Sequence, residues 1–416
     1  MTENKLLDEK LYIEKVHDVD VYICQKKDYN KKIAMFGTKY GSIESSFNIG
    51  KTRYDVPEGI AHFLEHKLFE NENSNSLDLF AKEGISANAY TSFDHTVYYF
   101  ETITKFKKGL EMLVDLVKTT YLTDENVEKE KGIIGQEISM YEDDAKYVLY
   151  YNTLQGMYVN NPVNIDIAGT VQTISKITKE DLTLCYNTFY SNNNMYIVVV
   201  GDVDKDEVIA DISKHLEKYN LNTCDYTLNL KEEPKNIKNK YVVKNMDVNK
   251  TLISVGYKMD INQNIILNDV ISKIINEMYF SASSKFYNDQ YLKGNVLEDI
   301  SFGYEGAKTF SHTLISTSVK DEKEFENDLN KYIEEIKNKE VDEELFINAK
   351  RKIKGEIIMD TEDISSSYRR IINAIITETD VYAETKYLDS VNKYDIKQFL
   401  NKLVEDSKSI AIIKSK

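Results

Sequence analysis

The chain has 416 residues, with 53 Lys and Arg against 69 Asp and Glu, which gives a formal net charge of −16. Such an acidic chain is not expected to bind nucleic acid or an anionic membrane surface, because both require a basic face. The sequence has no apolar run long enough to cross a membrane, and Met1–Lys15 lacks the apolar core of a signal peptide, so we expect a cytoplasmic protein of two or more domains. The cysteines are widely spaced, which predicts neither disulfides nor a cysteine zinc site: Cys24, Cys185 and Cys224.

Predicted strands and helices alternate along the first half of the chain. Strands are expected at residues 21–24 and 34–40, before a polar loop and a helix for which Pro57 is a suitable first residue. The next predicted elements are a helix at 76–82, strands at 85–90 and 96–103, helices at 108–121, 124–144 and 177–190, and a buried strand at 196–200. This alternation is typical of an α+β protein.

The helix after Pro57 carries the most informative motif, His62-Phe-Leu-Glu65-His66. Residues four apart on a helix differ by only about 40° in direction, so His62 and His66 can share one metal ion, and Glu65 lies within about 100° of both. The motif has the His-x-x-Glu-His spacing of the inverzincin metallopeptidases. The alternative is that two half-buried histidines share a face by chance, but Glu65 in register argues against it. Lys67 interrupts the apolar side of this helix, and the pattern gives no reason for a lysine there.

Two segments of the first half recur in the second half. Thr178–Leu182, followed by a helix and a strand, is similar to Asn392–Ile396, and Lys131–Met140 is similar to Lys350–Met359. Thr178 and Asn392 are suitable helix N-caps. Because two copies are too few for a solenoid, they predict a duplicated domain.

We therefore expect an α+β protein of two homologous domains, each a mostly antiparallel β-sheet packed with α-helices. The zinc-bearing catalytic domain is predicted at residues 1–221 and the homologous domain without metal ligands at residues 241–416. A polar linker over residues 222–240 contains Pro234 and joins them. The helix of the second half that matches the His motif, at about 265–280, has no histidine.

Two histidines need a third protein ligand, because a catalytic zinc ion usually has three and an exchangeable water. Glu137 is a candidate, since it interrupts an apolar stripe in which an unpaired charge would be costly. Glu130 lies two turns earlier on nearly the same face and could orient a ligand histidine. From spacing alone, both could instead be solvated carboxylates. The stripe consists of Val127, Ile133, Ile134, Ile138 and Tyr141.

Three segments of the sequence resemble the pitrilysin/insulinase family of zinc metallopeptidases. They are Glu58–Glu70, which contains the histidine motif, Gly84–Ser92, and Glu128–Ile138. Within this family the chain is most similar to bacterial members related to the mitochondrial processing peptidase β subunit. The likeness extends along nearly the whole chain.

The resemblance implies that His62, His66 and Glu137 bind zinc (Zn2+), that Glu65 is the general base, and that Glu130 orients a ligand histidine. Zinc would lower the pKa of its bound water and polarise the scissile carbonyl, while Glu65 takes the proton of the water and passes it to the departing amine. In this family Ser86–Ser92 is an edge strand to which a peptide substrate adds as a further strand, with Asn88 and Ala89 beside the zinc. From its residues alone, this segment would be an ordinary hairpin edge.

The second half departs from the family pattern. Members of this size usually contribute an Arg and a Tyr, seven residues apart, that bind substrate and support the transition state. In the corresponding segment Gln290 replaces the Arg and Leu297 replaces the Tyr, although a shifted alignment would offer Tyr304 as a substitute. We therefore expect a partner subunit to supply these groups, in a heterodimer with a zinc-free homologous chain or in a homodimer.

The sequence thus predicts a zinc-dependent endopeptidase that hydrolyses short or unfolded peptides. The alternative is a non-catalytic peptide-capture or assembly subunit on the same fold. The presence of all four of His62, Glu65, His66 and Glu137 favours the peptidase, because a non-catalytic subunit has no need of the complete set. A purely structural zinc ion is disfavoured, because a closed site usually has four protein ligands.

Overall fold

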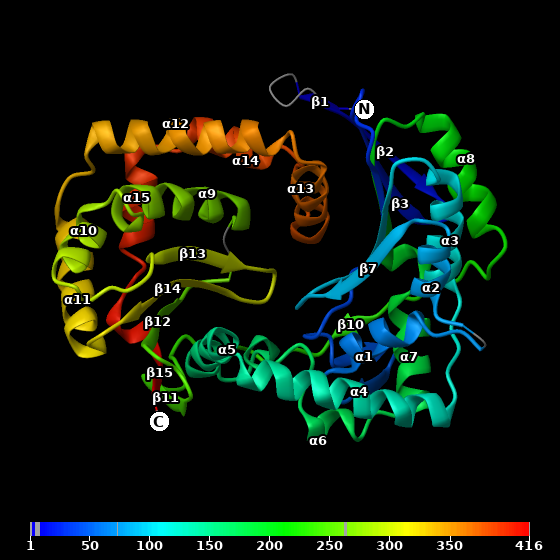
Figure 1. Cartoon of the computed structure of the whole chain (residues 1–416), viewed down its shortest axis with the longest axis horizontal. Coiled ribbons are helices and arrows are strands. Elements are labelled where there is room, and N and C mark those ends of the chain that lie inside the picture. The colour runs from blue at the N-terminus through cyan, green and yellow to red at the C-terminus, as the bar shows by residue number, and fades with distance from the viewer. Residues whose placement is uncertain (1, 5–8, 73, 262–263, 416) are drawn as a thin grey trace. The chain divides into compact units, whose positions relative to one another are not determined.

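The computed structural model of the chain describes residues 2–4, 9–72, 74–261 and 264–415. These residues form two compact units, each with its own sheet (Figure 1). Unit 1 consists of Met1–Ile138, Asp166–Leu230 and Asp360–Ile376. Unit 2 consists of Ser139–Ile165, Lys231–Met359 and Thr377–Lys416. Neither unit is a continuous piece of the chain.

Unit 1 is built on a seven-stranded sheet with the order β1-β2-β3-β9-β4-β8-β7. Neighbouring strands are antiparallel, except that β3 and β9 are parallel. The strands are β1 (Thr2–Asn4), β2 (Glu9–Val16), β3 (Val19–Gln25), β4 (Lys32–Thr38), β7 (Ser86–Thr91), β8 (Thr96–Thr102) and β9 (Met195–Gly201). A small sheet has the order β10-β5-β6 and is formed by β5 (Ser46–Ile49), β6 (Thr52–Asp55) and β10 (Thr227–Leu228).

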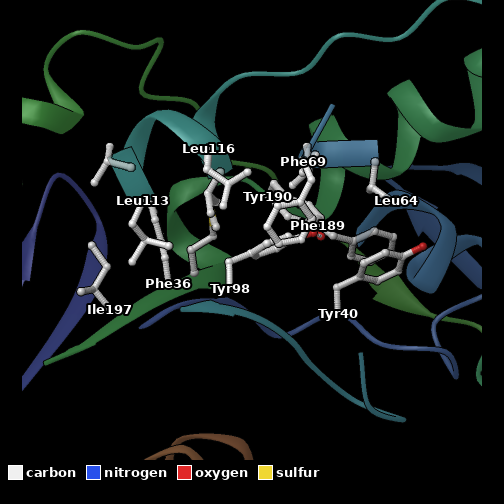
Figure 2. Packing of buried hydrophobic residues seen from close by; sticks show 14 of the residues in the cluster. Phe36, Tyr40, Leu64, Phe69, Tyr98, Leu113, Leu116, Phe189, Tyr190 and Ile197 are labelled. Atoms are coloured by element: carbon white, nitrogen blue, oxygen red, sulfur yellow. Dashed lines mark hydrogen bonds between the residues drawn. The ribbon is translucent and has the colours of Figure 1, made fainter. Parts of the chain in front are cut away.

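The core of unit 1 lies between its large sheet and the helices that the sequence places after the strands. Figure 2 shows Phe36 and Ile197 of the sheet with Leu113 and Leu116 of α3 (Phe106–Lys118) in this core. Every residue of β9 is buried, as expected for a continuous apolar run in the middle of a sheet. The helices are α1 (Ile60–Leu68), α2 (Ser76–Lys82), α3 (Phe106–Lys118), α4 (Asp124–Asp143), α6 (Val171–Ile174), α7 (Lys179–Phe189), η2 (Asn192–Asn194), α8 (Lys205–Leu216) and α13 (Ile364–Thr377).

Unit 2 is built on a five-stranded sheet with the order β11-β15-β12-β14-β13, in which only β11 and β15 are parallel among the described strands. The strands are β11 (Tyr241–Met246), β12 (Thr251–Lys258), β13 (Ser301–Gly306), β14 (Ser311–Val319) and β15 (Lys408–Ser415). The helices are α5 (Ala145–Met157), η1 (Pro162–Asn164), α9 (Ile265–Ile275), η3 (Asn276–Phe280), α10 (Lys285–Leu292), α11 (Glu322–Asn338), α12 (Glu343–Asp360), α14 (Ala383–Ser390), α15 (Lys393–Leu400) and η4 (Glu405–Ser407).

The two halves of the chain exchange one helix. The similar segments Lys131–Met140 and Lys350–Met359 lie on α4 and α12, and each of these helices is followed by a further helix, α5 or α13. α5 belongs to the first half of the sequence but lies in unit 2, where it packs on β12 and β15. α13 belongs to the second half of the sequence but lies in unit 1. This exchange is why neither unit is continuous.

Buried charges attach α13 to the sheet of unit 1. Glu9 of β2 is 1% exposed, and its carboxylate accepts a hydrogen bond from the Ser367 hydroxyl (2.6 Å) and pairs with Arg370. Lys26, after the end of β3, lies 3.1 Å from the same carboxylate. A buried carboxylate needs such partners, because an unpaired charge in the interior is costly.

The predicted fold class is confirmed. The main sheet of each unit consists mostly of antiparallel pairs. Its one parallel pair among the described strands is β3–β9 in unit 1 and β11–β15 in unit 2. The predicted N-caps Thr178 and Asn392 both form capping boxes. The predicted domain boundaries, at residues 221 and 241 on either side of a linker, were drawn from the duplicated sequence segments. They stay a prediction. In the part of the chain that the structure describes, no helix has the length and apolar character to span a bilayer.

Candidate metal centre

The helix with the histidine motif begins at a glycine. α1 starts at Ile60, and Gly59 caps it with a φ of 88°. A Cβ atom at Gly59 would lie 2.5 Å from the main-chain oxygen of Ala168, so both the left-handed backbone and the close packing require glycine here. The predicted start at Pro57 was wrong by three residues, because the chain turns at Gly59 before it becomes helical.

The two sides of α1 differ as the spacing predicts. Ile60, Phe63, Leu64 and Leu68 are at most 3% exposed and join the core of unit 1. The side chains of His62 and His66 are 12% and 27% exposed. The apolar side therefore fixes the helix, while His62 is largely buried and His66 is partly exposed.

Glu137 of α4 lies opposite both histidines. Its Oε1 is 3.7 Å from Nε2 of His62, and its Oε2 is 3.4 Å from Nε2 of His66. One ligand atom from each of the three residues lies within 4.8 Å of the others. Two imidazole nitrogens and a carboxylate oxygen are a donor set that suits zinc, so these residues fit a zinc ion by their chemistry and by their convergence.

Glu137 is held in place by the packing of α4. Val127, Ile134 and Ile138 of the predicted apolar stripe are buried, whereas Ile133 is 46% exposed. The stripe is therefore narrower than predicted. Glu137 lies beside it on the side that faces the histidines.

Burial and charge act differently on the two histidines. Burial, and then the neighbouring charge of His66, lower the pKa of His62 to about 4, so its imidazole is neutral and can donate a lone pair at neutral pH. Burial also opposes protonation of His66. The hydrogen bond with Glu130 and the charges of Glu65 and Glu137 outweigh burial, so the pKa of His66 is raised.

Glu130 contacts the second nitrogen of His66. Its Oε1 lies 3.2 Å from Nδ1 of His66, and its Oε2 lies 3.7 Å from Nζ of Lys67. Burial alone would raise the pKa of Glu130, but His66 and Lys67 outweigh it and the pKa is lowered. An ionised Glu130 favours the tautomer of His66 with the proton on Nδ1, which leaves Nε2 free to bind a metal ion.

Glu65 lies beside the three converging groups and has a different partner. It is 8% exposed, and its Oε2 accepts a hydrogen bond from the hydroxyl of Thr91 on β7 (2.6 Å). The hydroxyl of Thr96, which donates to the main-chain oxygen of Tyr40 (2.9 Å), lies 3.3 Å from Oγ1 of Thr91. Burial raises the pKa of Glu65, while the Thr91 hydrogen bond acts against this rise.

Strand β7 is the terminal strand of the described seven-stranded sheet. The N–H of Ser92 donates to the main-chain oxygen of His95 (2.7 Å), so by antiparallel alternation the main-chain groups of Ala87, Ala89 and Thr91 point away from β8. The side-chain oxygen of Asn88 accepts a hydrogen bond from the N–H of Ala89 (2.8 Å). Asn88 thus covers one donor of this edge.

The residues that the sequence singled out for the metal and for substrate on β7 all lie in unit 1: His62, Glu65, His66, Asn88, Ala89, Glu130 and Glu137. Of these, His62, His66 and Glu137 converge, and Glu130 contacts His66. Sequence reasoning missed Thr91 and the partners of Lys67. Thr91 lies in the quoted segment Gly84–Ser92, but strand spacing alone gives no sign that its hydroxyl reaches α1. Lys67 stands out in the sequence as a charge on an apolar helix side.

In unit 2, the residues at the predicted substitutions have structural contacts. Gln290 is 1% exposed and donates to Oδ2 of Asp328 (2.7 Å). Leu297 is 40% exposed. The hydroxyl of Tyr304 accepts a hydrogen bond from Oγ of Ser311 (3.0 Å).

Two protein-family models match the chain. Residues 47–171 match the insulinase family, peptidase family M16. Residues 176–353 match the peptidase M16 inactive domain. The Bacillus subtilis protein named "uncharacterized zinc protease YmfH" is 40% identical over 323 residues, which are 75% of this chain and 75% of that protein. Human mitochondrial-processing peptidase subunit beta is 31% identical over 161 residues, 38% of this chain and 33% of its own length.

Solved structures show the same fold. An M16-like peptidase from Alicyclobacillus acidocaldarius has a TM-score of 0.94 at 30% identity, over 98% of this chain and 99% of that chain. A protease from Helicobacter pylori has a TM-score of 0.84 at 20% identity, over 98% of this chain and 99% of that chain.

Proposed function

Because the chain belongs to the insulinase family, peptidase family M16, we propose that it is a zinc-dependent endopeptidase that hydrolyses short or unfolded peptides. The observation that carries the proposal is the convergence of His62, His66 and Glu137, with the Glu65 carboxylate on the same helix as the histidines. The zinc proteases among its relatives support the choice of metal.

In this proposal His62, His66 and Glu137 hold the zinc ion. When bound, zinc would lower the pKa of a water molecule and polarise the scissile carbonyl. Glu130 keeps the proton of His66 on Nδ1, so that Nε2 faces Glu137 as a ligand atom. Burial lowers the pKa of His62, which favours the neutral imidazole that a metal ion binds.

Glu65 is the proposed general base. It takes a proton from the attacking water and gives it to the departing amine, so the same carboxylate serves both halves of the hydrolysis. A base must be held in a fixed direction to do this, and the Thr91 hydroxyl supplies a hydrogen bond to Oε2 of Glu65. The other oxygen, Oε1, is the one we assign to the water.

We further propose that an extended peptide binds by adding a strand to β7. The open main-chain groups of Ala87, Ala89 and Thr91 would pair with the peptide, and such pairing tolerates varied sequences. The N–H of Ala89 already has a partner in the side chain of Asn88. Binding would therefore require Asn88 to turn away and release this donor.

A partner subunit is part of the proposal. Gln290, which replaces the Arg expected from the family resemblance, is buried against Asp328 and has a structural role of its own. Leu297 cannot replace a tyrosine hydroxyl. A zinc-free homologous chain, or a second copy of this chain, would supply the missing groups. One-to-one co-purification of such a chain from native extract would support this, whereas full activity of the isolated monomer would contradict it.

The rival function is a non-catalytic peptide-capture or assembly subunit, and one experiment separates the two. The protein is incubated with a mixed peptide library, alone and with its co-purifying partner, then with a chelator, and then with zinc restored. A peptidase loses cleavage with the chelator and regains it with zinc, and Glu65→Gln abolishes cleavage without loss of zinc. Binding of peptides without cleavage in every condition would favour the rival.

A further inference from the structure

Lys67 is a buried charge at the metal centre to which the proposed mechanism gives no role. It follows His66 on α1, and its side chain is 0% exposed. A buried ammonium group has lost its hydration, so it needs anionic or polar oxygens in place of water. Its neighbours therefore indicate what it does.

Three groups with oxygen atoms surround Nζ of Lys67. Nζ pairs with the carboxylate of Glu70 and donates to the main-chain oxygen of Asn126 (3.2 Å). It also lies 3.7 Å from Oε2 of Glu130. The last distance is that of an ion pair and not of a hydrogen bond, so Lys67 acts on Glu130 through its charge.

Glu130 connects this lysine to a proposed zinc ligand. One of its carboxylate oxygens contacts Nδ1 of His66 and the other is paired with Lys67. The carboxylate is thus held between side chains from two consecutive positions of α1. Any change in its position is transmitted to the ring of His66, whose Nε2 faces Glu137.

We propose that Lys67 is a positioning residue of the metal centre: its charge holds Glu130 against His66, and Glu130 in turn fixes His66 as a ligand. The inference rests on the proposed function, because it takes His66 to be a zinc ligand. A lysine also suits the local charge. Four carboxylates lie on or against α1, and Lys67 brings a positive charge among them: Glu65, Glu70, Glu130 and Glu137.

The test is a double-mutant cycle on zinc affinity in the full-length chain, measured by competition with a chromophoric chelator and without substrate. Lys67→Met removes the charge and nearly keeps the side-chain length. We expect it to weaken zinc binding about 10-fold, and Glu130→Gln to weaken it about 10- to 100-fold, as for other groups that orient metal ligands. Because Lys67 acts through Glu130, the double variant should match Glu130→Gln within about threefold.

Glu70→Gln is the matched control, because it removes the other carboxylate at Lys67 and leaves the contact with Glu130. It should keep the zinc affinity within about threefold. If Lys67→Met does not fold because Glu70 is left unpaired, Lys67→Met/Glu70→Gln replaces it in the cycle. NMR of 15N-labelled histidine gives a second readout: the Nδ1–H signal of His66 should shift in Lys67→Met and stay in Glu70→Gln.

An unchanged zinc affinity in folded Lys67→Met would overturn the inference. Losses that multiply in the double variant would also overturn it, because Lys67 would then act independently of Glu130. If the unsubstituted chain took up no zinc, the inference and the proposed function would fail together. If it bound zinc with the expected pattern but cleaved no peptide even together with its co-purifying partner, the proposed function alone would fail.

Discussion

The hydroxyl of Thr91 donates a hydrogen bond of 2.6 Å to Oε2 of Glu65, so the strand proposed to bind substrate also holds the proposed general base. Thr91→Val keeps the side-chain shape and removes the donor. A hydrogen bond to a charged group contributes about 1.5–3 kcal/mol, so kcat should fall about 10- to 100-fold, with KM and zinc content nearly unchanged. Peptide cleavage assays of each variant together with the co-purifying partner measure kcat and KM. Thr91→Ser should keep kcat within about threefold, and an equal loss in both variants would show that the methyl group matters and the hydroxyl does not.

Glu65→Gln tests the general base directly. The amide fills the same space but cannot take a proton from water, so turnover should fall by about 10²- to 10⁴-fold, the usual contribution of general acid–base catalysis. Zinc content measured by elemental analysis should equal that of the unsubstituted protein, because Glu65 is not among the converging ligand groups. Wild-type turnover in this variant would exclude Glu65 as the base.

The ligand set can be tested by a comparison between the two halves of the chain. Glu137→Ala removes a group that lies 3.4 Å from Nε2 of His66, and His62→Ala removes the other imidazole, so each should lose stoichiometric zinc. Glu356 is the residue of the similar segment on α12, and it pairs with Lys352 (3.9 Å). Among the described residues it belongs to no group that could hold a metal ion. Glu356→Ala is therefore the matched control and should keep full zinc. Retained zinc in Glu137→Ala would remove Glu137 from the ligand set.

Much of the fold was predictable because it depends on local patterns. The helix at residues 76–82 has the predicted bounds, and the strands β4, β7, β8 and β9 lie within two residues of their predicted limits. The exchange of α5 and α13 was not predictable. α5 packs on β12 and β15, and α13 contacts Glu9 of β2, so each lies against a sheet whose strands come from the other half of the chain. The period of apolar residues does not show which sheet a helix will contact.

In the site too, features that depend on local spacing were predictable and tertiary contacts were not. The spacing of His62, Glu65 and His66 along one helix follows from helix geometry, and Glu137 was a candidate because a charge interrupts apolar residues. The hydroxyl of Thr91 and the buried Nζ of Lys67 reach the site through tertiary contacts with α1 and α4. Lys67 is visible in the sequence as a charge on an apolar helix side, but the pattern does not show which groups either side chain will contact. The start at Pro57 was wrong for a local reason, since the left-handed turn at Gly59 comes first.

The attachment of α13 to unit 1 should depend on Glu9. Its buried carboxylate pairs with Lys26 (3.1 Å) and with Arg370, so Glu9→Gln leaves two cations without their counter-charge. Breaking a buried pair in this way destabilises a protein by about 3–5 kcal/mol. Urea unfolding followed by circular dichroism should show the loss in unit 1. Glu14→Gln on the same strand is the control: Glu14 pairs with Lys205 at the surface, and such pairs contribute about 0–1 kcal/mol. Equal effects would contradict the role of the buried cluster.

The stability of unit 2 should depend on pH through the ionisation of Glu233. Its carboxylate accepts hydrogen bonds from the main-chain N–H groups of Val159 (2.9 Å), Asn160 (2.8 Å) and Asn161 (2.6 Å), and it pairs with Lys258. Burial alone would raise its pKa, but Lys258 and the three N–H groups outweigh burial, so the pKa is lowered in the folded state. The folded protein therefore binds fewer protons at Glu233 than the unfolded chain does just below the ordinary pKa of Glu.

The sign of this effect follows from linkage. The stabilisation by Glu233 is complete above the ordinary pKa of Glu, about 4.3, and is lost as the pH falls through the lowered pKa of the folded state. Glu233→Gln should lower the free energy of unfolding at pH 7 by about 2–4 kcal/mol, because Lys258 is left without its counter-charge and one amide N–H₂ faces other donors. Urea unfolding at a series of pH values from 7 down to 3 should show the difference constant above pH 5 and shrinking below about 4.3. A difference that stays constant down to pH 3 would contradict this prediction, because it would show that the pKa of Glu233 is the same in the folded and the unfolded protein and that its ionisation does not stabilise unit 2.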